Sequence, residues 1–413
     1  MSFRVLGRRG HRLGGGSVDI AHLTFRPPEA TGSFNRLVAA QLRQLSNLHQ
    51  VSISYAEVDG QLLLSTDDKH LRISPPGVLK RQALKVFASL RRGEEWIRDV
   101  DRLAYAMGAI QCLRSLQPRL IVCYDEYKLG RILRGKVSWP CRLVLSQRGF
   151  SYNLAPNGAG RALYSLDCFD AVVTMSVCAY AYDAARIHAY EPSLYVVPNC
   201  VDTDHFRPLD TRSRDDLRRE CGFRTEDGVV LCLGRQVPKK GAHLIVESWP
   251  RVLQARPTAL LWIVGPGEPR YWARMVRTAD ALGVRDRVRF TGPVLPRDAA
   301  RCYQAADAYV FPTLCQEGQG KALLEAMACG LPCISSAFGT AVEHYSPDEV
   351  ILVPNPNLCD AFVEPIVRIL GCRHLRYSLS RAARRAAVER FSEREVFPLL
   401  EQFYRRQLEM VTG

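Results

Sequence analysis

The chain has 413 residues, of which 47% are hydrophobic and 24% are charged, and its formal net charge is +14. This balance excludes a disordered or fibrous chain, and the length favours two domains over one. No window of about 18 consecutive apolar residues is present, so we expect no transmembrane helix.

The amino-terminal half alternates strand-like and helix-like segments after a basic, glycine-rich stretch, residues 1–17, which we interpret as a flexible leader. The predicted strands are Val18–Leu23, Val51–Tyr55, Leu120–Cys123, Leu143–Ser146 and Ala171–Met175, and the predicted helices are Ser33–Leu45, Val78–Arg91 and Glu94–Leu116. Strands that alternate with helices indicate a parallel sheet covered on both faces.

The carboxyl-terminal half repeats this scheme after a seam near Tyr195–Asp202, where a strand runs into a turn that contains proline. Its predicted strands are Val229–Leu233, Ala259–Val264, Val288–Thr291, Ala308–Phe311, Cys333–Ser335 and Val350–Val353. A last helical stretch, about Glu389–Met410, contains Pro398, which we expect to kink or restart it. The predicted class is α/β, with two doubly wound domains whose strands end at a common ligand-binding cleft.

The stretch FPTLCQEGQGKALLEAMACGLP, residues 311–332, carries the strongest chemical signal. It predicts a strand end, a glycine turn and a helix that begins near Lys321 and stops at Gly330. Unpaired amides at the start of such a helix favour an anion. Two carboxylates, Glu317 and Glu325, flank the same loop and can accept hydrogen bonds from hydroxyls. A phosphate joined to a polyol, as in a sugar nucleotide, fits both features.

A second loop, Gly234–Gly241, follows the first strand of the carboxyl-terminal half and has the sequence GRQVPKKG. Arginine can hold phosphate oxygens through two parallel hydrogen bonds, and lysine supplies a mobile positive charge. Alone, this octapeptide is equally consistent with a solvated basic turn. Beside the loop of Glu317 in the same sheet, a diphosphate site is the preferred interpretation.

Five segments in this order resemble the retaining family-four glycosyltransferases of GT-B fold. They are VVPNCVDTDHF (196–206), LGRQVPKKG (233–241), WIVGPGE (262–268), VRFTG (288–292) and EGQGKALLEAMACGLP (317–332). The resemblance spans about residues 190–345. It implies an amino-terminal domain over 18–195 that a carboxyl-terminal helix, about 389–413, completes, and a nucleotide-sugar-binding domain over 196–388.

The resemblance also implies roles for individual positions. Arg235 and Lys240 would hold the donor diphosphate, Glu317 would bind the donor sugar, and Glu325 would hold the ribose hydroxyls. The backbone from Gly318 through Gln319, Gly320, Lys321 and Ala322 would contact sugar and phosphate, and Arg289 and Phe290 would border the base. The donor is then a UDP- or GDP-linked sugar used as substrate, with no cofactor and no metal ion.

The sequence departs from the family pattern in three places. Cys200 stands where the hinge segment usually has glycine, and Gln319 replaces the more usual aromatic residue. The histidine that the amino-terminal domain commonly offers to the donor sugar is missing, and Arg148 is our candidate to replace it, with a structural salt bridge as the alternative. Gly32 could let the backbone approach phosphate, or it could be an ordinary turn glycine.

The positive charge is concentrated in residues 1–190, which hold 26 Lys and Arg against 15 Asp and Glu, whereas the remainder holds 30 against 27. This asymmetry suggests an anionic partner such as a membrane surface, although arginine-rich codon usage is an alternative. Residues 78–92 could form a basic amphipathic helix on a membrane, or an ordinary helix packed on the core. The 14 cysteines include no C-x-x-C pair, which favours buried thiols in a reducing compartment.

Together these patterns predict a retaining, metal-independent hexosyltransferase with a lipid-linked or cell-envelope glycan acceptor. We expect it in the cytoplasm, with a peripheral position on the inner face of the plasma membrane as an option. The alternatives are an enzyme with a soluble small-molecule acceptor, or a catalytically weak glycan-binding scaffold. No nucleic-acid-binding motif accompanies the charge, so we expect no nucleic-acid partner.

Overall fold

The computed structural model describes residues 18–24, 48, 50–55, 70–73, 100–125, 127–148, 166, 168–184, 193–317 and 319–411. Within these ranges the side chains of residues 24, 51–55, 70–73, 100–104, 127–128, 182–184 and 359 are not described. The predicted leader, Gly32, the predicted helices Ser33–Leu45 and Val78–Arg91, and Gly318 lie outside the described residues.

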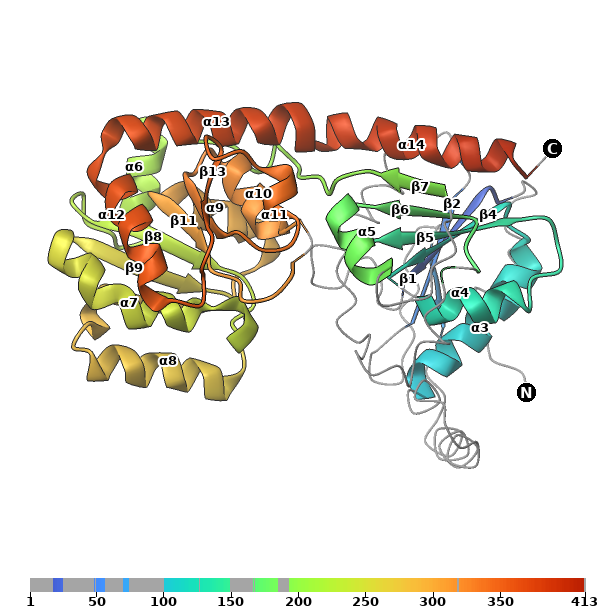
Figure 1. Cartoon of the computed structure of the whole chain (residues 1–413), viewed down its shortest axis with the longest axis horizontal. Helices are drawn as coiled ribbons and strands as arrows, with labels where there is room; N and C mark the ends of the chain where they lie inside the picture. Colours follow the sequence, from blue (N-terminus) through green and yellow to red (C-terminus); the bar gives the residue numbers. More distant parts are fainter. Residues whose placement is uncertain are drawn as a thin grey trace. The chain divides into compact units, whose positions relative to one another are not determined.

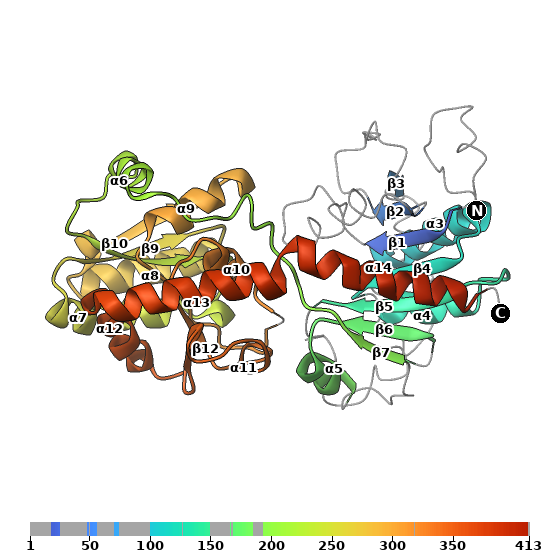
Figure 2. The same ribbon diagram turned by 90° about the horizontal axis from the view of Figure 1, so that it is seen from above.

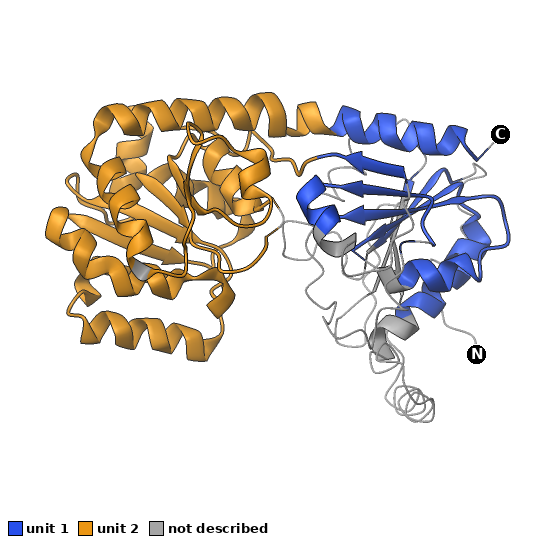
Figure 3. Cartoon of the chain, in the orientation of Figure 1, with its two compact units in different colours: residues 1–197, 397–413 blue, residues 198–396 orange. Residues whose placement is uncertain are grey.

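The chain divides into two compact units (Figure 3). Unit 1 comprises residues 1–197 and 397–413, and unit 2 comprises residues 198–396. Helix α14, Glu393–Glu409, begins in unit 2 and ends in unit 1. Each unit is built on one parallel β-sheet (Figure 1), so the predicted α/β class is confirmed.

Unit 1 contains a seven-stranded parallel sheet with the order β3-β2-β1-β4-β5-β6-β7, which Figure 2 shows from above. Its described elements are β1 Ile20–Thr24, β2 Gln50–Tyr55, β3 His70–Ile73, α3 Val100–Leu116, β4 Leu120–Tyr124, α4 Tyr127–Arg134, β5 Arg142–Gln147, β6 Ala171–Thr174, α5 Val177–Ala184 and β7 Ser193–Val196. Strands β4 and β6 are buried along their whole length, as expected for central parallel strands covered on both faces.

Unit 2 contains a six-stranded parallel sheet with the order β10-β9-β8-β11-β12-β13. Its strands are β8 Gly228–Leu233, β9 Ala259–Val264, β10 Val288–Gly292, β11 Ala308–Phe311, β12 Cys333–Ser336 and β13 Val350–Val353. Its helices are α6 Thr211–Glu220, α7 Ala242–Ala255, α8 Pro269–Ala281, α9 Ala299–Ala305, α10 Lys321–Ala328, α11 Ala341–His344, α12 Val363–Gly371 and α13 Arg373–Phe391.

Two hydrophobic clusters cover the faces of the unit 2 sheet because successive side chains of a strand point to opposite sides. Val229 and Leu231 of β8 pack in the cluster that includes α9, α10 and α13. Val230 and Cys232 pack in the cluster that includes α7, α8 and α12. These helices lie on the two faces of the sheet in Figure 1.

The last helical segment differs from its prediction in one respect. The chain leaves the helical path at Ser392, between α13 and α14, whereas Pro398 lies inside α14. The Ser392 hydroxyl accepts a hydrogen bond from the Glu395 amide at 3.3 Å, which is the geometry of a helix N-cap. The amide of Val201 donates to the Phe391 carbonyl at 2.8 Å and fixes this break. The restart therefore follows from a serine cap and not from the proline.

Candidate functional site

The candidate site lies at the carboxyl edge of the unit 2 sheet, where the loops after β8, β9 and β11 meet. Gly241 has φ +74°, and a Cβ atom there would overlap the carbonyl of Pro312, which follows β11. Gly265 has φ +128°, and a Cβ atom there would overlap the carbonyl of Gly234, which follows β8. Glycine is therefore required at both positions, because conformation and contact each exclude a side chain. These close approaches bring the basic loop and the Glu317 loop together.

Lys240 and Glu317 form an ion pair at this edge, with 2.6 Å between Nζ and Oε1. Each side chain keeps 19% of its surface exposed, so the pair is half-buried and open to solvent on one side. The Cys315 thiol donates to the same Oε1 at 3.3 Å, and the Lys240 ammonium lies 5.3 Å from the centre of the Phe311 ring. One carboxylate oxygen of Glu317 thus holds two donors, and a cation lies directly beside the carboxylate.

The backbone around Glu317 is held from the other side by the segment that follows β12. The Thr340 amide donates to the Glu317 carbonyl at 3.3 Å, and a Cβ atom at Gly339 would overlap the Glu317 backbone. A small cavity bounded by Phe311, Gly320 and Tyr345 opens beside this loop. The loop is therefore packed between two backbone segments, which positions the Glu317 carboxylate.

Arg235 is an exposed side chain in the loop after β8, five residues before Lys240. Its neighbour Gln236 is buried. The side-chain nitrogen Nε2 of Gln236 donates to the carbonyls of Gly234 and Val264 at 3.0 Å each, which ties the loop to the sheet. The loop is thus fixed while the arginine remains accessible, which is the arrangement needed to bind an anion from solvent.

Helix α10 begins at Lys321 after Gly320, which caps the helix without a side-chain hydrogen bond. The amides of Leu323 and Leu324 both donate to the Gly320 carbonyl, at 3.0 and 3.1 Å. Lys321 and Ala322 occupy the first two positions of α10. Gly320 packs on Phe311, so the helix start lies next to the Lys240–Glu317 pair.

Glu325 lies one turn further along α10 and is only 4% exposed. The hydroxyl of Tyr303, on α9, donates to Glu325 Oε2 at 3.1 Å. Burial, and then the neighbouring Glu325 charge, raise the pKa of Tyr303 well above its usual value, so the tyrosine stays protonated and remains a donor. Tyr303 therefore orients the Glu325 carboxylate, a role that the sequence alone did not predict.

Gln319 points into the protein, since its side chain is 3% exposed. Its Oε1 accepts a hydrogen bond from the Asn199 amide at 2.6 Å, and its carbonyl accepts one from Asn199 Nδ2 at 3.2 Å. Residue 319 thus ties the loop of Glu317 to the segment that begins unit 2.

Arg289 and Phe290 lie on β10 and contact other elements. The Arg289 guanidinium donates to the carbonyls of Cys221 and Gly222 at 2.5 and 3.2 Å and lies 4.4 Å from the centre of the Phe223 ring. The Phe290 ring packs edge-on against Trp272 of α8 at 5.6 Å. Neither side chain contacts the Lys240–Glu317 pair; these contacts are internal to the fold.

Arg148 follows β5 in unit 1 and is 7% exposed. Its Nε donates to the Ser146 hydroxyl at 3.0 Å and its Nη1 donates to the Val197 carbonyl at 2.9 Å, whereas Nη2 is buried without an acceptor among the described residues. The side chain thus ties β5 to the end of unit 1 through two neutral acceptors. The salt bridge considered from the sequence does not form among the described residues.

A buried polar network that the sequence did not predict lies beside Arg148 in unit 1. His22 of β1 is flanked by the Tyr124 hydroxyl and by Gln50 Oε1, each at 2.9 Å, and the Tyr124 hydroxyl lies 3.4 Å from that of Tyr404 on α14. Burial raises the pKa of Tyr124 well above its usual value. The partners come from positions 22, 50, 124 and 404, so only the fold brings them together.

The described cysteine side chains are all free thiols, and burial raises the pKa of Cys232 to about 12. No group of three His, Cys, Asp or Glu side chains within the described ranges is arranged to hold a metal ion. The described part of the chain also contains no helix that is long and apolar enough to cross a membrane.

Known proteins resemble this chain in sequence and in fold. Residues 227–371 match the family "Glycosyl transferases group 1". One relative is the GDP-mannose-dependent monoacylated alpha-(1-6)-phosphatidylinositol monomannoside mannosyltransferase of Corynebacterium glutamicum, to which the chain is 33% identical over 204 residues. The matched region covers 48% of this chain and 52% of that protein. The match thus spans about half the length of this relative.

Two further comparisons extend over most of the chain. The chain is 26% identical to Spore coat protein SA of Bacillus subtilis over 75% of its own length and 83% of that protein. The solved structure of sucrose-phosphate synthase from Thermosynechococcus elongatus has a TM-score of 0.75 at 21% identity and covers 95% of this chain and all of that one. The chain therefore has the GT-B fold, and its residues 227–371 match the group 1 glycosyl transferase family.

Proposed function

We propose that this protein is a glycosyltransferase that moves a hexose from a nucleoside-diphosphate sugar to a lipid-linked or cell-envelope glycan acceptor. The observation that carries the proposal is the Lys240–Glu317 pair at 2.6 Å beside the start of α10. A cation, a carboxylate and the start of helix α10 at one sheet edge match the diphosphate and the hydroxyls of a sugar nucleotide. The relationship to the group 1 family supports the same interpretation.

Each candidate residue then has a role in this reaction. Arg235 and Lys240 bind the diphosphate and offset the negative charge that grows on the leaving group. Glu317 accepts hydrogen bonds from the sugar and stabilises positive charge at the anomeric carbon, while Lys321 and Ala322 offer backbone amides to the phosphate. Glu325, held by Tyr303, accepts hydrogen bonds from the ribose hydroxyls. Positioning and electrostatic stabilisation thus supply most of the rate enhancement.

We propose that the transfer retains the anomeric configuration. The bond between the anomeric carbon and the phosphate oxygen breaks, and the acceptor hydroxyl bonds to the same face of that carbon. The hydroxyl proton passes to the departing phosphate oxygen, so no protein base is required. A double displacement would need a nucleophile and a second carboxyl group about 5 Å apart, and Glu325 is committed to Tyr303 on the inner side of α10.

The first donor to test is GDP-mannose, because the relative from Corynebacterium glutamicum depends on that donor. UDP-linked sugars are the alternative. That relative acts on a phosphatidylinositol mannoside, which makes a mannosylated membrane lipid the first acceptor class to test. Such an acceptor would place the enzyme at an anionic membrane surface, in keeping with the positive charge of residues 1–190.

A scaffold or glycan-binding protein is the second candidate, and two observations favour it. Spore coat protein SA matches over three quarters of the chain. In addition, Arg148, our candidate for a sugar contact in unit 1, is buried and bound to Ser146 and Val197. Neither observation accounts for the exposed Arg235 or the solvent-open Lys240–Glu317 pair, so we prefer the enzyme.

The test is a transfer assay with radiolabelled GDP-mannose or UDP-glucose and either phosphatidylinositol mannoside vesicles or soluble sugar phosphates. We expect label from one donor to enter the organic phase, and we expect Glu317→Gln to reduce the rate strongly. Nuclear magnetic resonance of the product reports whether the anomeric configuration is retained. If wild-type protein binds a nucleotide but neither transfers nor hydrolyses any donor, the scaffold becomes the better interpretation.

A further inference from the structure

A second cationic site lies at the opposite, amino edge of the unit 2 sheet. A cavity of about 550 Å³ opens there, bounded by the first residues of β8 and β9 and by Asp307, which precedes β11. This volume is in the range of small-molecule sites. Six arginines line it: Arg214, Arg218, Arg219, Arg224, Arg256 and Arg376. Since the six residues of β8 span about 20 Å, the cavity is separate from the Lys240–Glu317 pair.

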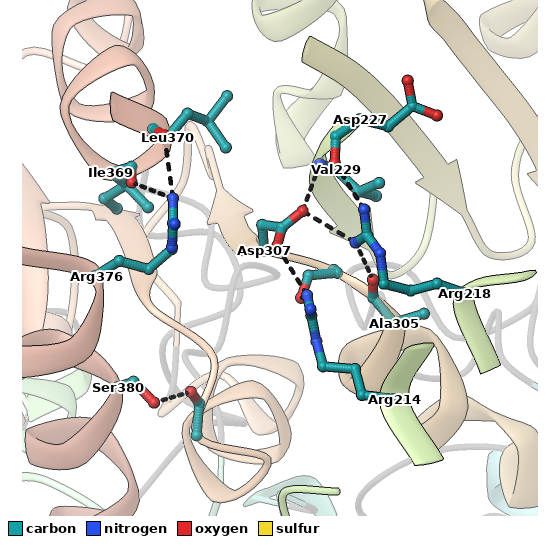
Figure 4. A network of polar contacts seen from close by, with 12 residues as sticks. Arg214, Arg218, Asp227, Val229, Ala305, Asp307, Ile369, Leu370, Arg376 and Ser380 are labelled. Atoms are coloured by element: carbon teal, nitrogen blue, oxygen red, sulfur yellow. Dashed lines mark hydrogen bonds and ion pairs between the residues drawn. The ribbon is translucent and has the colours of Figure 1, made fainter. Parts of the chain in front are cut away.

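One wall of the cavity is a network in which Asp307 pairs with two arginines (Figure 4). Asp307 Oδ1 accepts from Arg214 at 2.7 Å, and Oδ2 accepts from Arg218 at 3.0 Å and from the Val229 amide at 2.8 Å. Arg218 also donates to the carbonyls of Ala305 and Asp227, at 2.8 and 2.7 Å. These contacts fix this wall of the cavity. Because Asp307 is already shared between Arg214 and Arg218, it does not neutralise the charge of the other four arginines.

Of the remaining arginines, Arg219 is paired with Asp216, and the other three are less completely paired. Arg376 reaches from α13 and uses one nitrogen, Nη1, for the carbonyls of Ile369 and Leu370 at 3.1 and 3.0 Å (Figure 4). Arg224 is exposed at the mouth. Arg256 is half-buried, and its Nε is buried with no acceptor among the described residues. That nitrogen is enclosed by the protein, so a ligand in the cavity would contact the terminal nitrogens of Arg256 and not Nε.

The backbone also accommodates the Arg256 guanidinium. It lies directly over Gly371, the last residue of α12, where a Cβ atom would overlap its Nη2.

The cavity lining holds four acidic residues, Asp215, Glu226, Asp227 and Asp307, against the six arginines, which leaves a net charge of +2. Asp227 is itself engaged by Arg287 at 3.4 Å. The unbalanced charge is therefore positive, and it lies on the Arg224, Arg256 and Arg376 side.

We propose that this cavity binds a small anion with one or more phosphate groups, held chiefly by Arg256 and Arg224. Guanidinium groups present paired N–H donors in the geometry that phosphate oxygens accept, and the lining of this cavity carries a net charge of +2. The site is independent of the proposed sugar-nucleotide site and stands whether or not the chain transfers sugar.

The experiment measures binding of inorganic pyrophosphate by isothermal titration calorimetry at constant ionic strength. The background variant is Arg235→Ala/Lys240→Ala, which removes cations from the other sheet edge. We expect one saturable site in this background. Adding Arg224→Gln/Arg256→Gln should weaken binding by about tenfold or more, because two charged hydrogen-bond donors are lost. Arg277→Gln, on exposed α8, removes one charge elsewhere and should leave the affinity unchanged.

Gly371→Ala gives an independent variant that keeps every charge. It should displace the Arg256 guanidinium and weaken pyrophosphate binding while the net charge stays at +14. Circular dichroism and the unfolding midpoint establish that each variant is folded, and Arg224→Gln alone serves if the double variant is not. The proposal is overturned if the background variant shows no saturable binding at millimolar pyrophosphate. It is equally overturned if the arginine variants bind as tightly as the background.

Discussion

The two units differ in how far the charged and polar side chains on their parallel sheets are exposed to solvent. In unit 2, Arg235 is exposed, and the Lys240–Glu317 pair is open to solvent on one side. In unit 1, Arg148 directly after β5 is 7% exposed and His22 within β1 is 0% exposed, whereas Asp125 directly after β4 is exposed. The same strand arrangement thus presents charge in one unit and encloses polar groups in the other.

From this difference we expect substitutions in the two units to affect different properties: ligand binding and catalysis in unit 2, and stability in unit 1. Substitutions of the accessible charged side chains at the unit 2 edge should reduce ligand binding and catalysis with little effect on stability. Substitutions in the unit 1 network should lower stability with little effect on nucleotide binding, because buried polar groups lose their partners.

Lys240→Ala should have the largest effect on activity. Removing a cation from the leaving-group side should reduce kcat/KM by about 10²–10³-fold, equivalent to about 3–4 kcal/mol of transition-state stabilisation. Initial-rate kinetics with the donor found in the transfer assay measure it. Lys239→Ala, an exposed neighbour, is the matched control and should stay within about twofold of wild type. Equal losses in both variants would assign the effect to general charge and not to the site.

Gly241→Ala should lower the stability of unit 2 by about 2–3 kcal/mol. A side chain there must adopt φ +74° and displace the Pro312 carbonyl. Gly283→Ala is the control, since Gly283 has φ +66° but nothing within 4 Å of the added Cβ. It should cost about 1 kcal/mol. Urea unfolding measures both, and equal costs would contradict the close contact between the two loops.

Arg148→Met should lower the stability of unit 1 by about 2 kcal/mol, because the Ser146 hydroxyl and the Val197 carbonyl lose a buried donor. The dissociation constant of the preferred nucleoside diphosphate should change by less than about twofold. Urea unfolding and a nucleotide titration on the same sample provide both numbers. An undiminished stability with a large loss of catalysis would show that Arg148 acts on substrate instead.

Tyr303→Phe should weaken nucleotide binding by about fivefold, since it removes the hydrogen bond that orients Glu325, worth about 1 kcal/mol. The effect should shrink with a 2′,3′-dideoxy nucleotide, which has no ribose hydroxyls to present to Glu325. Calorimetric titration of both nucleotides into both proteins measures this coupling. The same loss for both nucleotides would place the ribose away from Glu325.

Removal of divalent cations should have the smallest effect. Because Arg235, Lys240 and helix amides are proposed to bind the diphosphate, excess chelator should change the transfer rate by no more than about twofold. The rate is measured in chelator and again after magnesium or manganese is restored. A strict requirement for either ion would contradict the proposed role of the basic loop.

The strands of unit 2 could be predicted closely because each is a short apolar run between turn residues. The predicted bounds of β9, Ala259–Val264, agree with the structure. Strand β3, His70–Ile73, was missed: it lies at the edge of its sheet, and its histidine and arginine break the apolar run. The helix restart at Ser392 had a sequence signal, a serine three residues before Glu395, that the nearby proline obscured.

The candidate site could be predicted only as far as its loops. Motif residues mark Lys240 and Glu317, which lie 77 positions apart, but not that they pair with each other. Two supporting contacts, Tyr303 with Glu325 and Asn199 with Gln319, join residues that are far apart in the sequence. A local sequence pattern therefore cannot predict them. Gln319 itself resembles a ligand-facing residue by position, yet its side chain is buried, because the fold places the start of unit 2 beside it.

The most direct test of the proposed donor site is thermal unfolding with GDP and UDP, for wild type and for Arg235→Ala/Lys240→Ala. A ligand at 100 times its dissociation constant adds about 2.7 kcal/mol of stability, which a melting curve resolves. We predict that one nucleotide raises the melting temperature of wild type and leaves that of the double variant unchanged. No shift in wild type at millimolar nucleotide, or an equal shift in both proteins, would contradict the account.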